Sequence, residues 1–216
     1  MFWDILDQPR QLLLKKLSGD LPIPGSYLAG GTALALLIGH RYSVDLDWFS
    51  PQDFDPGKLG SQLKRFGEVR IAETSSGTFH GWVDDIQVTW LRYPNPLLEP
   101  LVESEDSPGL KLASLVDIGL MKWAAVSDRG ARKDFFDLYA LEKRGVTAER
   151  LYPLLVVKYP NANINYYHMI KSLAYFDDAE REAMPVMLEE ADWEAVKVYF
   201  RRVQAKLLKE KMVLGK

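Results

Sequence analysis

Val44-Asp45-Leu46-Asp47-Trp48-Phe49 is the stretch that decides the fold, because acidic and apolar residues alternate along it. Such alternation predicts a strand with one buried face. Asp45 and Asp47 then point to the same side, with Cα atoms roughly 6–7 Å apart, and Leu46 and Trp48 point into a core. Two convergent carboxylates repel unless a cation lies between them, and Mg²⁺ commonly takes one or two carboxylates. The pair therefore predicts a Mg²⁺ site, the alternative being two solvated acids on a strand edge.

Gly30-Gly31-Thr32 lies upstream, between an expected strand and an expected helix. A glycine-rich turn exposes backbone N–H groups at the start of a helix, where phosphate binds well, and the Thr32 hydroxyl can add a hydrogen bond. Fourteen positions separate Gly31 from Asp45, enough for one helix and a returning strand. The turn and the carboxylates are therefore expected to face one pocket. Taken alone, the turn could equally be a plain tight turn.

Further along the chain, the hydrophobic period changes from two to about 3.6 near residues 100–110. The expected strands cover residues 26–29, 44–49, 68–73, 78–83 and 86–91, and Asp84-Asp85 is expected to form a tight hairpin turn. Helices are expected over residues 5–18, 33–37, 57–66, 112–128, 132–143, 148–158, 163–175 and 192–212. The pattern predicts an α/β (α+β) protein with a small mixed sheet and flanking helices at residues 1–105. A helical region packed on that core is expected at residues 106–216.

Composition narrows the function only slightly. The 216 residues are 47% hydrophobic and 26% charged, as in an ordinary globular protein, and the net charge of −3 gives no global signature of nucleic-acid binding. The absence of cysteine excludes disulfides and thiolate metal sites. The N-terminus has no signal-peptide pattern, and the most apolar stretch, residues 28–39, is too short to span a membrane. A cytoplasmic protein with no membrane partner is expected.

Two signatures in this order resemble those of the AbiEii/AbiGii toxin family, within the DNA polymerase beta-like nucleotidyltransferases. The first runs from Gly30-Gly31-Thr32-Ala33-Leu34-Ala35-Leu36 through Gly39-His40-Arg41 and Ser43 to Asp45-Leu46-Asp47-Trp48-Phe49. The second consists of Lys122-Trp123-Ala124-Ala125, Arg129 and Arg132-Lys133-Asp134-Phe135-Phe136-Asp137-Leu138-Tyr139. The two signatures cover most of residues 27–140.

The resemblance implies a nucleotidyltransferase fold and a reaction. The expected activity moves a nucleoside monophosphate from a nucleoside triphosphate, with Mg²⁺, onto an acceptor that is RNA such as tRNA or is protein. It also implies a toxin that works beside a separate antitoxin. The implied assignments are metal binding by Asp45 and Asp47, triphosphate binding by Gly30, Gly31, Thr32, Arg41 and Ser43, and catalytic roles for Asp45, Asp47, Lys122 and Asp134. Purely structural roles for Lys122, Asp134 and Asp137 are the alternative.

One position departs from the superfamily's pattern. A third carboxylate is usual on a neighbouring strand, but the aligned residue here is Thr89, whose neutral hydroxyl is a poor base. Asp85 is a weak substitute, and His80 is interpreted as a strand residue rather than a base. Thr89 favours an alternative, in which the protein is a degenerate module that binds nucleotide without turnover. In that case Thr89→Asp would restore activity. An obligate subunit that acts mainly through its antitoxin is a third possibility.

Overall fold

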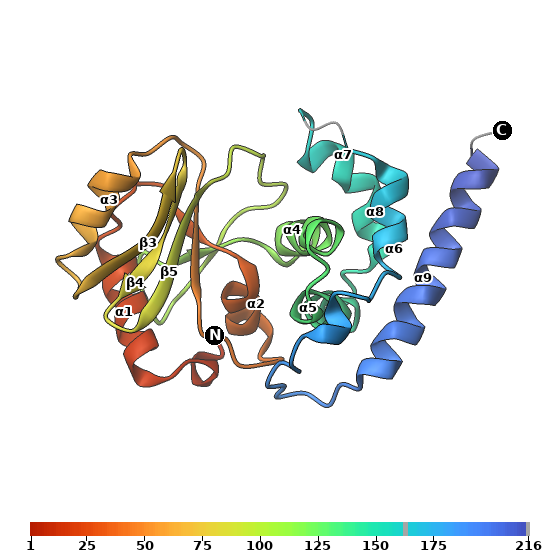
Figure 1. The fold of residues 1–216 in the computed structure, drawn as a ribbon, viewed down its shortest axis with the longest axis horizontal. Coiled ribbons are helices and arrows are strands. Elements are labelled where there is room, and N and C mark those ends of the chain that lie inside the picture. Colours follow the sequence, from red (N-terminus) through yellow and green to blue (C-terminus); the bar gives the residue numbers. More distant parts are fainter. Residues whose placement is uncertain (162–163, 215–216) are drawn as a thin grey trace. The chain divides into compact units, whose positions relative to one another are not determined.

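The computed structural model describes the backbone of residues 1–161 and 164–214 and the side chains up to residue 209, apart from 162–163. Within them the chain divides into two compact units, Met1–Ser114 and Leu115–Lys216 (Figure 1). The boundary predicted from the sequence lies between residues 105 and 106. The first unit extends further because a short strand at residues 111–112 joins its sheet beside the strand at residues 27–28.

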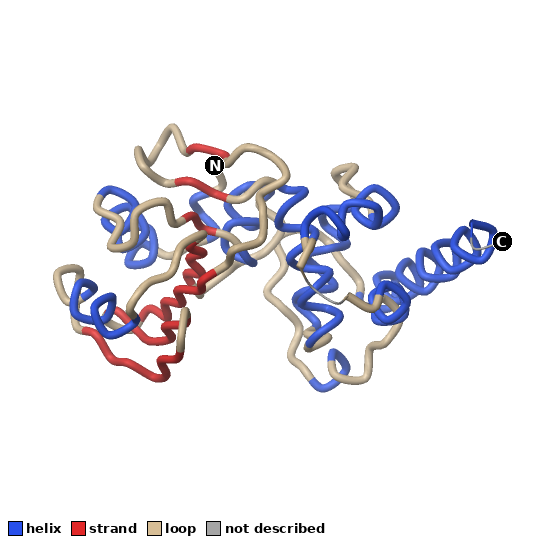
Figure 2. The backbone as a smooth tube through the Cα atoms, turned by 90° about the horizontal axis from the view of Figure 1, so that it is seen from above, coloured by secondary structure: helices blue, strands red, loops and turns tan. Residues whose placement is uncertain are grey.

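The first unit contains all of the strands found in the described part of the chain, which Figure 2 shows in red. They are β1 (Tyr27–Leu28), β2 (Leu46–Ser50), β3 (Val69–Ser75), β4 (Thr78–Val83), β5 (Ile86–Arg92), β6 (Val102–Glu103) and β7 (Lys111–Leu112). Its helices are η1 (Trp3–Ile5), α1 (Gln8–Gly19), α2 (Gly30–Ile38) and α3 (Pro56–Leu63). Residues 5–18 were expected to be helical with a restart at Pro9, and α1 begins at Gln8, because the Asp7 side chain caps it and Pro9 suits its first turn.

The seven strands form one mixed sheet in the order β3-β4-β5-β2-β1-β7-β6. Strand β2 runs parallel to β5 and antiparallel to β1, and β1 runs parallel to β7. Strands β3, β4 and β5 form an antiparallel meander. The turn between β4 and β5 lies at Asp84-Asp85, as predicted, and Asp84 adopts a φ of 53°. The mixed sheet with flanking helices confirms the predicted fold class.

Two helices lie on opposite faces of this sheet (Figure 1). Helix α3 covers one face, because Gly60 lies against Phe79 of β4. On the same face Trp48 and Trp90 stack with ring centroids 5.0 Å apart, and both are fully buried. Helix α2 begins on the other face, where Gly30 meets the side chain of Asp47. The alternation predicted for β2 is therefore confirmed for Leu46 and Trp48, which are both fully buried.

The second unit is helical. Its elements are α4 (Leu115–Asp128), α5 (Arg132–Glu142), α6 (Ala148–Leu151), η2 (Tyr152–Leu154), α7 (Leu155–Lys158), α8 (Tyr166–Ser172), η3 (Ala179–Arg181) and α9 (Trp193–Leu214). The single helix expected at 148–158 is divided by η2, because Pro153 cannot donate a backbone hydrogen bond. Helix α8 starts later than expected, since Asn165 caps it by accepting from the His168 N–H. Residue 163, where that helix was expected to begin, lies outside the described residues.

A fully buried ion pair joins α4 to α7. Lys158 Nζ lies 2.6 Å from Asp117 Oδ1, and both side chains are 0% exposed. Burial lowers the pKa of Lys158, although its hydrogen bond to Asp117 and the charge of Asp117 act in the opposite direction. Across residues 1–161 and 164–214, no helix combines the length and the apolar character needed to cross a bilayer.

Candidate active site

Asp47 lies where β2 meets the start of α2. Gly30, the first residue of α2, has a φ of 70°, in the left-handed region that favours glycine. A Cβ atom on Gly30 would lie 2.9 Å from Oδ2 of Asp47, so the carboxylate approaches the helix backbone as closely as glycine permits. The Ala29 N–H donates to the Asp47 carbonyl at 3.1 Å, which fixes the strand against β1. The structure therefore brings the predicted glycine turn and one predicted carboxylate together.

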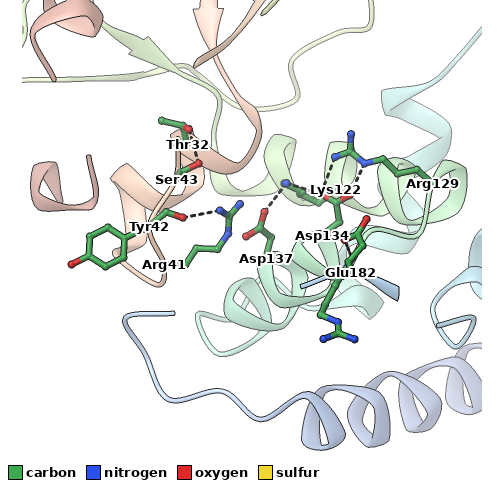
Figure 3. A network of polar contacts seen from close by, with 10 residues as sticks. Thr32, Arg41, Tyr42, Ser43, Lys122, Arg129, Asp134, Asp137 and Glu182 are labelled. Atoms are coloured by element: carbon green, nitrogen blue, oxygen red, sulfur yellow. Dashed lines mark hydrogen bonds and ion pairs between the residues drawn. The ribbon is translucent and has the colours of Figure 1, made fainter. Parts of the chain in front are cut away.

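Thr32 connects α2 to the segment that precedes β2. Its hydroxyl donates to the backbone carbonyl of Asp45 and lies 2.7 Å from Ser43 Oγ (Figure 3). Thr32 is 1% exposed. These contacts hold the chain at Ser43 and Asp45 against the first turn of the helix. A phosphate contact of Thr32 or Ser43 stays a prediction, and the structure gives both hydroxyls a local structural role.

The remaining candidates of the first unit lie near this turn in sequence. Asp45 is half-buried and precedes β2, which begins at Leu46, so strand alternation places the Asp47 side chain but not that of Asp45. Gly31 is buried in the first turn of α2. Arg41 is 5% exposed, and its Nη1 donates to the Tyr42 carbonyl at 2.9 Å. Their predicted contacts with metal or phosphate stay predictions.

Gly30→Ala is expected to destabilise the first unit by about 1–2 kcal/mol, the cost of the left-handed conformation for an L-residue. It is also expected to displace the Asp47 carboxylate and to lower nucleotide transfer. Gly25→Ala is the matched control, because Gly25 also has a positive φ, 78°, but a Cβ there would meet only Gln52 at 3.7 Å. Denaturant unfolding and transfer rates of both variants check the expectation. Equal transfer rates would contradict the role assigned to the close approach.

A row of polar side chains crosses the sheet on the face that bears Asp47. Thr89 of β5 pairs in register with Asp47 of β2, and His80 of β4 pairs with Thr89. Glu73 of β3 pairs with His80. Paired residues project to the same face, so these four residues form one line across four strands. Thr89 is 4% exposed, and its Oγ1 lies 3.1 Å from Nδ1 of His80.

The structure therefore places Thr89 beside Asp47, on the strand where the superfamily's third carboxylate was sought. His80 was interpreted from the sequence as a strand residue, and its place beside Thr89 was not predicted. The information was nevertheless present, because the two-residue turn at Asp84-Asp85 pairs Val83 with Ile86 and fixes the register of the strands that it joins. Counting back from that turn brings position 80 opposite position 89.

Four charged side chains of the second signature, Lys122, Arg129, Asp134 and Asp137, form an ion-pair cluster within the second unit. Lys122 Nζ lies 2.7 Å from Asp134 Oδ1 and 2.6 Å from Asp137 Oδ2 (Figure 3). Arg129 Nε lies 2.9 Å from Asp134 Oδ2. The two carboxylates are fully buried and the Lys122 side chain is 5% exposed. Lys122 is therefore not an ordinary exposed lysine.

The electrostatics of Asp134 follow from these partners. Burial acts to raise the pKa of Asp134, but the positive charges of Lys122 and Arg129, and their hydrogen bonds, outweigh it and lower the pKa below its usual range. Asp134 is therefore held ionised. A carboxylate that is buried and already bonded by two cations is suited to fixing α4 and α5 together. A direct role of Lys122 or Asp134 in transfer stays a prediction.

Asp45 and Asp47 are of the ligand type that suits Mg²⁺, and a Mg²⁺ site at this position stays a prediction. Asp45 and Asp47 offer hard carboxylate oxygens, and the close approach at Gly30 leaves room for a carboxylate but for no further side chain. In the part of the chain that the structure describes, no group of three or more His, Asp or Glu side chains could enclose a metal by itself. Water and substrate phosphates would complete the coordination, as Mg²⁺ prefers.

The family model and the solved structures that are similar to this chain are described as nucleotidyltransferases, in agreement with the predicted fold. A family model described as nucleotidyl transferase AbiEii toxin, type IV TA system, matches residues 12–208. An uncharacterized protein of Aquifex aeolicus (strain VF5) is 37% identical over 179 residues, which cover 82% of this chain and 84% of that protein. A putative nucleotidyltransferase from H. pylori has a similar structure, with a TM-score of 0.56, 20% identity and coverage of 98% and 99% of the two chains. The nucleotidyltransferase toxin MenT4 from Mycobacterium tuberculosis H37Rv gives a TM-score of 0.53, 16% identity and coverage of 90% and 80%.

Proposed function

The chain belongs to the AbiEii nucleotidyltransferase toxin family, and from this premise we propose that it moves a nucleoside monophosphate from a nucleoside triphosphate onto an acceptor hydroxyl. The acceptor oxygen would bond to the α-phosphorus while the bond to the β-phosphate breaks and pyrophosphate leaves. The observation that carries the proposal is the Asp47 carboxylate held against Gly30 at the start of α2. Negative phosphate oxygens and a carboxylate at one helix N-terminus need a shared cation.

The residues of the first unit then have defined tasks. The backbone at Gly30 and Gly31 would bind phosphate oxygens, because Ala29 at the N-cap offers no side-chain cap to the first turn. Thr32 would hold Asp45 in place through its bond to the Asp45 carbonyl. Mg²⁺, bound by Asp45 and Asp47, would neutralise phosphate charge and favour in-line attack.

The test is a transfer assay with the whole chain. Each of the four nucleoside triphosphates, labelled at the α-phosphate, is offered with total tRNA and with the protein itself, in Mg²⁺ and in excess chelator. Label is expected on one acceptor class in Mg²⁺ only, and the result names both the nucleotide and the acceptor. If the chain neither binds nucleotide nor transfers label, the proposal is wrong.

A second candidate function is favoured by Thr89, which is neutral at the position where a third carboxylate is usual. In that case the chain binds nucleotide in Mg²⁺ without turnover. Nucleotide affinity without any labelled product in the same assay would support it. The antitoxin partner and the cytoplasmic location expected from the sequence remain predictions.

A further inference from the structure

Glu73, His80, Thr89 and Asp47 form a row across the sheet, and this row places a histidine next to the threonine that stands where a third carboxylate is usual. Neighbouring strands lie about 4.8 Å apart, so Thr89 is one strand from Asp47 and His80 is two. The Cα atoms of His80 and Asp47 are therefore roughly 10 Å apart, too far for the two side chains to bind the same metal ion directly. Thr89 lies between them, with its hydroxyl 3.1 Å from the imidazole.

Thr89 alone is a poor proton acceptor, because a neutral hydroxyl near neutral pH holds its own proton. A hydroxyl hydrogen-bonded to an imidazole is different, since it can pass its proton to the ring while it receives another. Nδ1 accepts that proton in the tautomer that carries hydrogen on Nε2. We propose that Thr89 and His80 together remove the proton of the acceptor hydroxyl, in place of the third carboxylate. This inference rests on the proposed transferase activity.

The proton balance of the step is complete. The acceptor oxygen bonds to the α-phosphorus and pyrophosphate leaves with the bonding pair. The acceptor proton moves to Thr89 Oγ1, and the Thr89 proton moves to His80 Nδ1. The resulting imidazolium faces Glu73 across the β3–β4 pair, whose carboxylate is suited to stabilise the charge. The imidazolium then returns its proton to water.

The charges around His80 are few on this face. Glu73 and Arg70 come from β3, and Arg70 is engaged with Trp82, 5.5 Å from the ring centroid, and with Asp85 at 3.1 Å. On β5 the residues that share this face with Thr89 carry no charge, and Asp47 follows on β2. Helix α3 packs on the opposite face. Within the described sheet, Glu73 is therefore the charged group in register with His80.

The first part of the test separates the hydroxyl from the packing. Thr89→Val keeps the shape of the side chain and removes the hydroxyl, whereas Thr89→Ser keeps the hydroxyl. Thr89→Val and His80→Gln are each expected to lower kcat by about 10²–10⁴-fold, the usual contribution of general base catalysis. Thr89→Ser is expected to retain most activity. His168→Gln, an exposed histidine of the second unit, is the matched control and is expected to match the unmodified chain.

Two further readouts exclude a merely structural role. Nucleotide affinity in Mg²⁺, measured by equilibrium binding, is expected to stay unchanged in Thr89→Val and His80→Gln. The pH profile of the transfer rate is expected to differ between the unmodified chain and His80→Gln, because only the unmodified chain carries an imidazole beside Thr89. The double variant Thr89→Asp/His80→Gln is expected to recover transfer, because a carboxylate then stands at position 89, beside Asp47.

The outcomes are distinguishable. If the unmodified chain transfers label but His80→Gln and Thr89→Val retain its rate and its pH profile, this inference is wrong and the proposed function stands. Equal losses in Thr89→Ser and Thr89→Val would also overturn the relay, because Thr89→Ser keeps the hydroxyl that Thr89→Val removes. If the unmodified chain transfers nothing, the proposed function fails and the relay fails with it.

Discussion

Asp47→Asn is expected to lower the rate of nucleotide transfer by about 10³-fold or more. Asparagine keeps the size of the side chain, so the contact at Gly30 remains filled and the strand keeps its place. What is lost is one negative charge and one hard oxygen donor to the cation. Metal assistance is worth several kcal/mol to such reactions, and about 1.4 kcal/mol corresponds to a tenfold change in rate.

The measurement is the initial rate of labelled transfer at saturating nucleotide, with Mg²⁺ varied. Asp4→Asn serves as control, because Asp4 is an exposed acid of the same unit. Asp45→Asn is expected to act in the same direction as Asp47→Asn. If the rate of Asp47→Asn lies within tenfold of the rate of the unmodified chain and depends on Mg²⁺ in the same way, the proposed contact of Asp47 with the metal is wrong.

Lys122→Met is expected to destabilise the second unit by about 3–5 kcal/mol, because it leaves buried carboxylates without their ammonium. Asp134 would keep Arg129, but Asp137 would lose its Lys122 contact. Denaturant unfolding and hydrogen exchange of α4 and α5 measure the loss. Lys209→Met, at an exposed position of α9, is the control and is expected to change stability by less than about 0.5 kcal/mol.

The same cluster predicts a dependence on pH. The folded pKa of Asp134 lies below its unfolded value of about 3.9, so its ionised form contributes stability above that pH. This contribution is lost as the pH falls through the lowered folded pKa. Asp134→Asn is therefore expected to flatten the acid limb of the stability curve. If Lys122→Met instead abolished transfer while stability stayed within 1 kcal/mol of the original, the catalytic role predicted from the sequence would be favoured over the structural one.

The regular parts of the fold could be predicted because they carry strong periodicity. The alternation around Asp47 and the turn at Asp84-Asp85 predicted β2 and the β4–β5 hairpin, and both are present. The short strands β6 and β7 could not be predicted in this way, since two residues contain no period. Strand β7 lies beyond the predicted boundary at residue 105, whereas β6 lies before it.

Side-chain environments were less accessible to sequence reasoning. A lysine in a helix is usually solvated, and the burial of Lys122 depends on two acids from the following helix. The contact of Thr89 with His80 needs the strand register as well as the residue types. The glycine turn and Asp47 could be related from their spacing, because one helix and one strand allow few connections.

The pairing of Leu28 with Leu112 has a consequence for how the chain is made. Strand β1 emerges early from the ribosome, but its neighbour β7 is among the last segments of the first unit to be synthesised. The sheet therefore closes late, whereas the β3–β4–β5 meander pairs with segments already present. A fragment ending at residue 105 would expose one edge of β1 to pairing with other chains. A fragment ending at Ser114 would cover it.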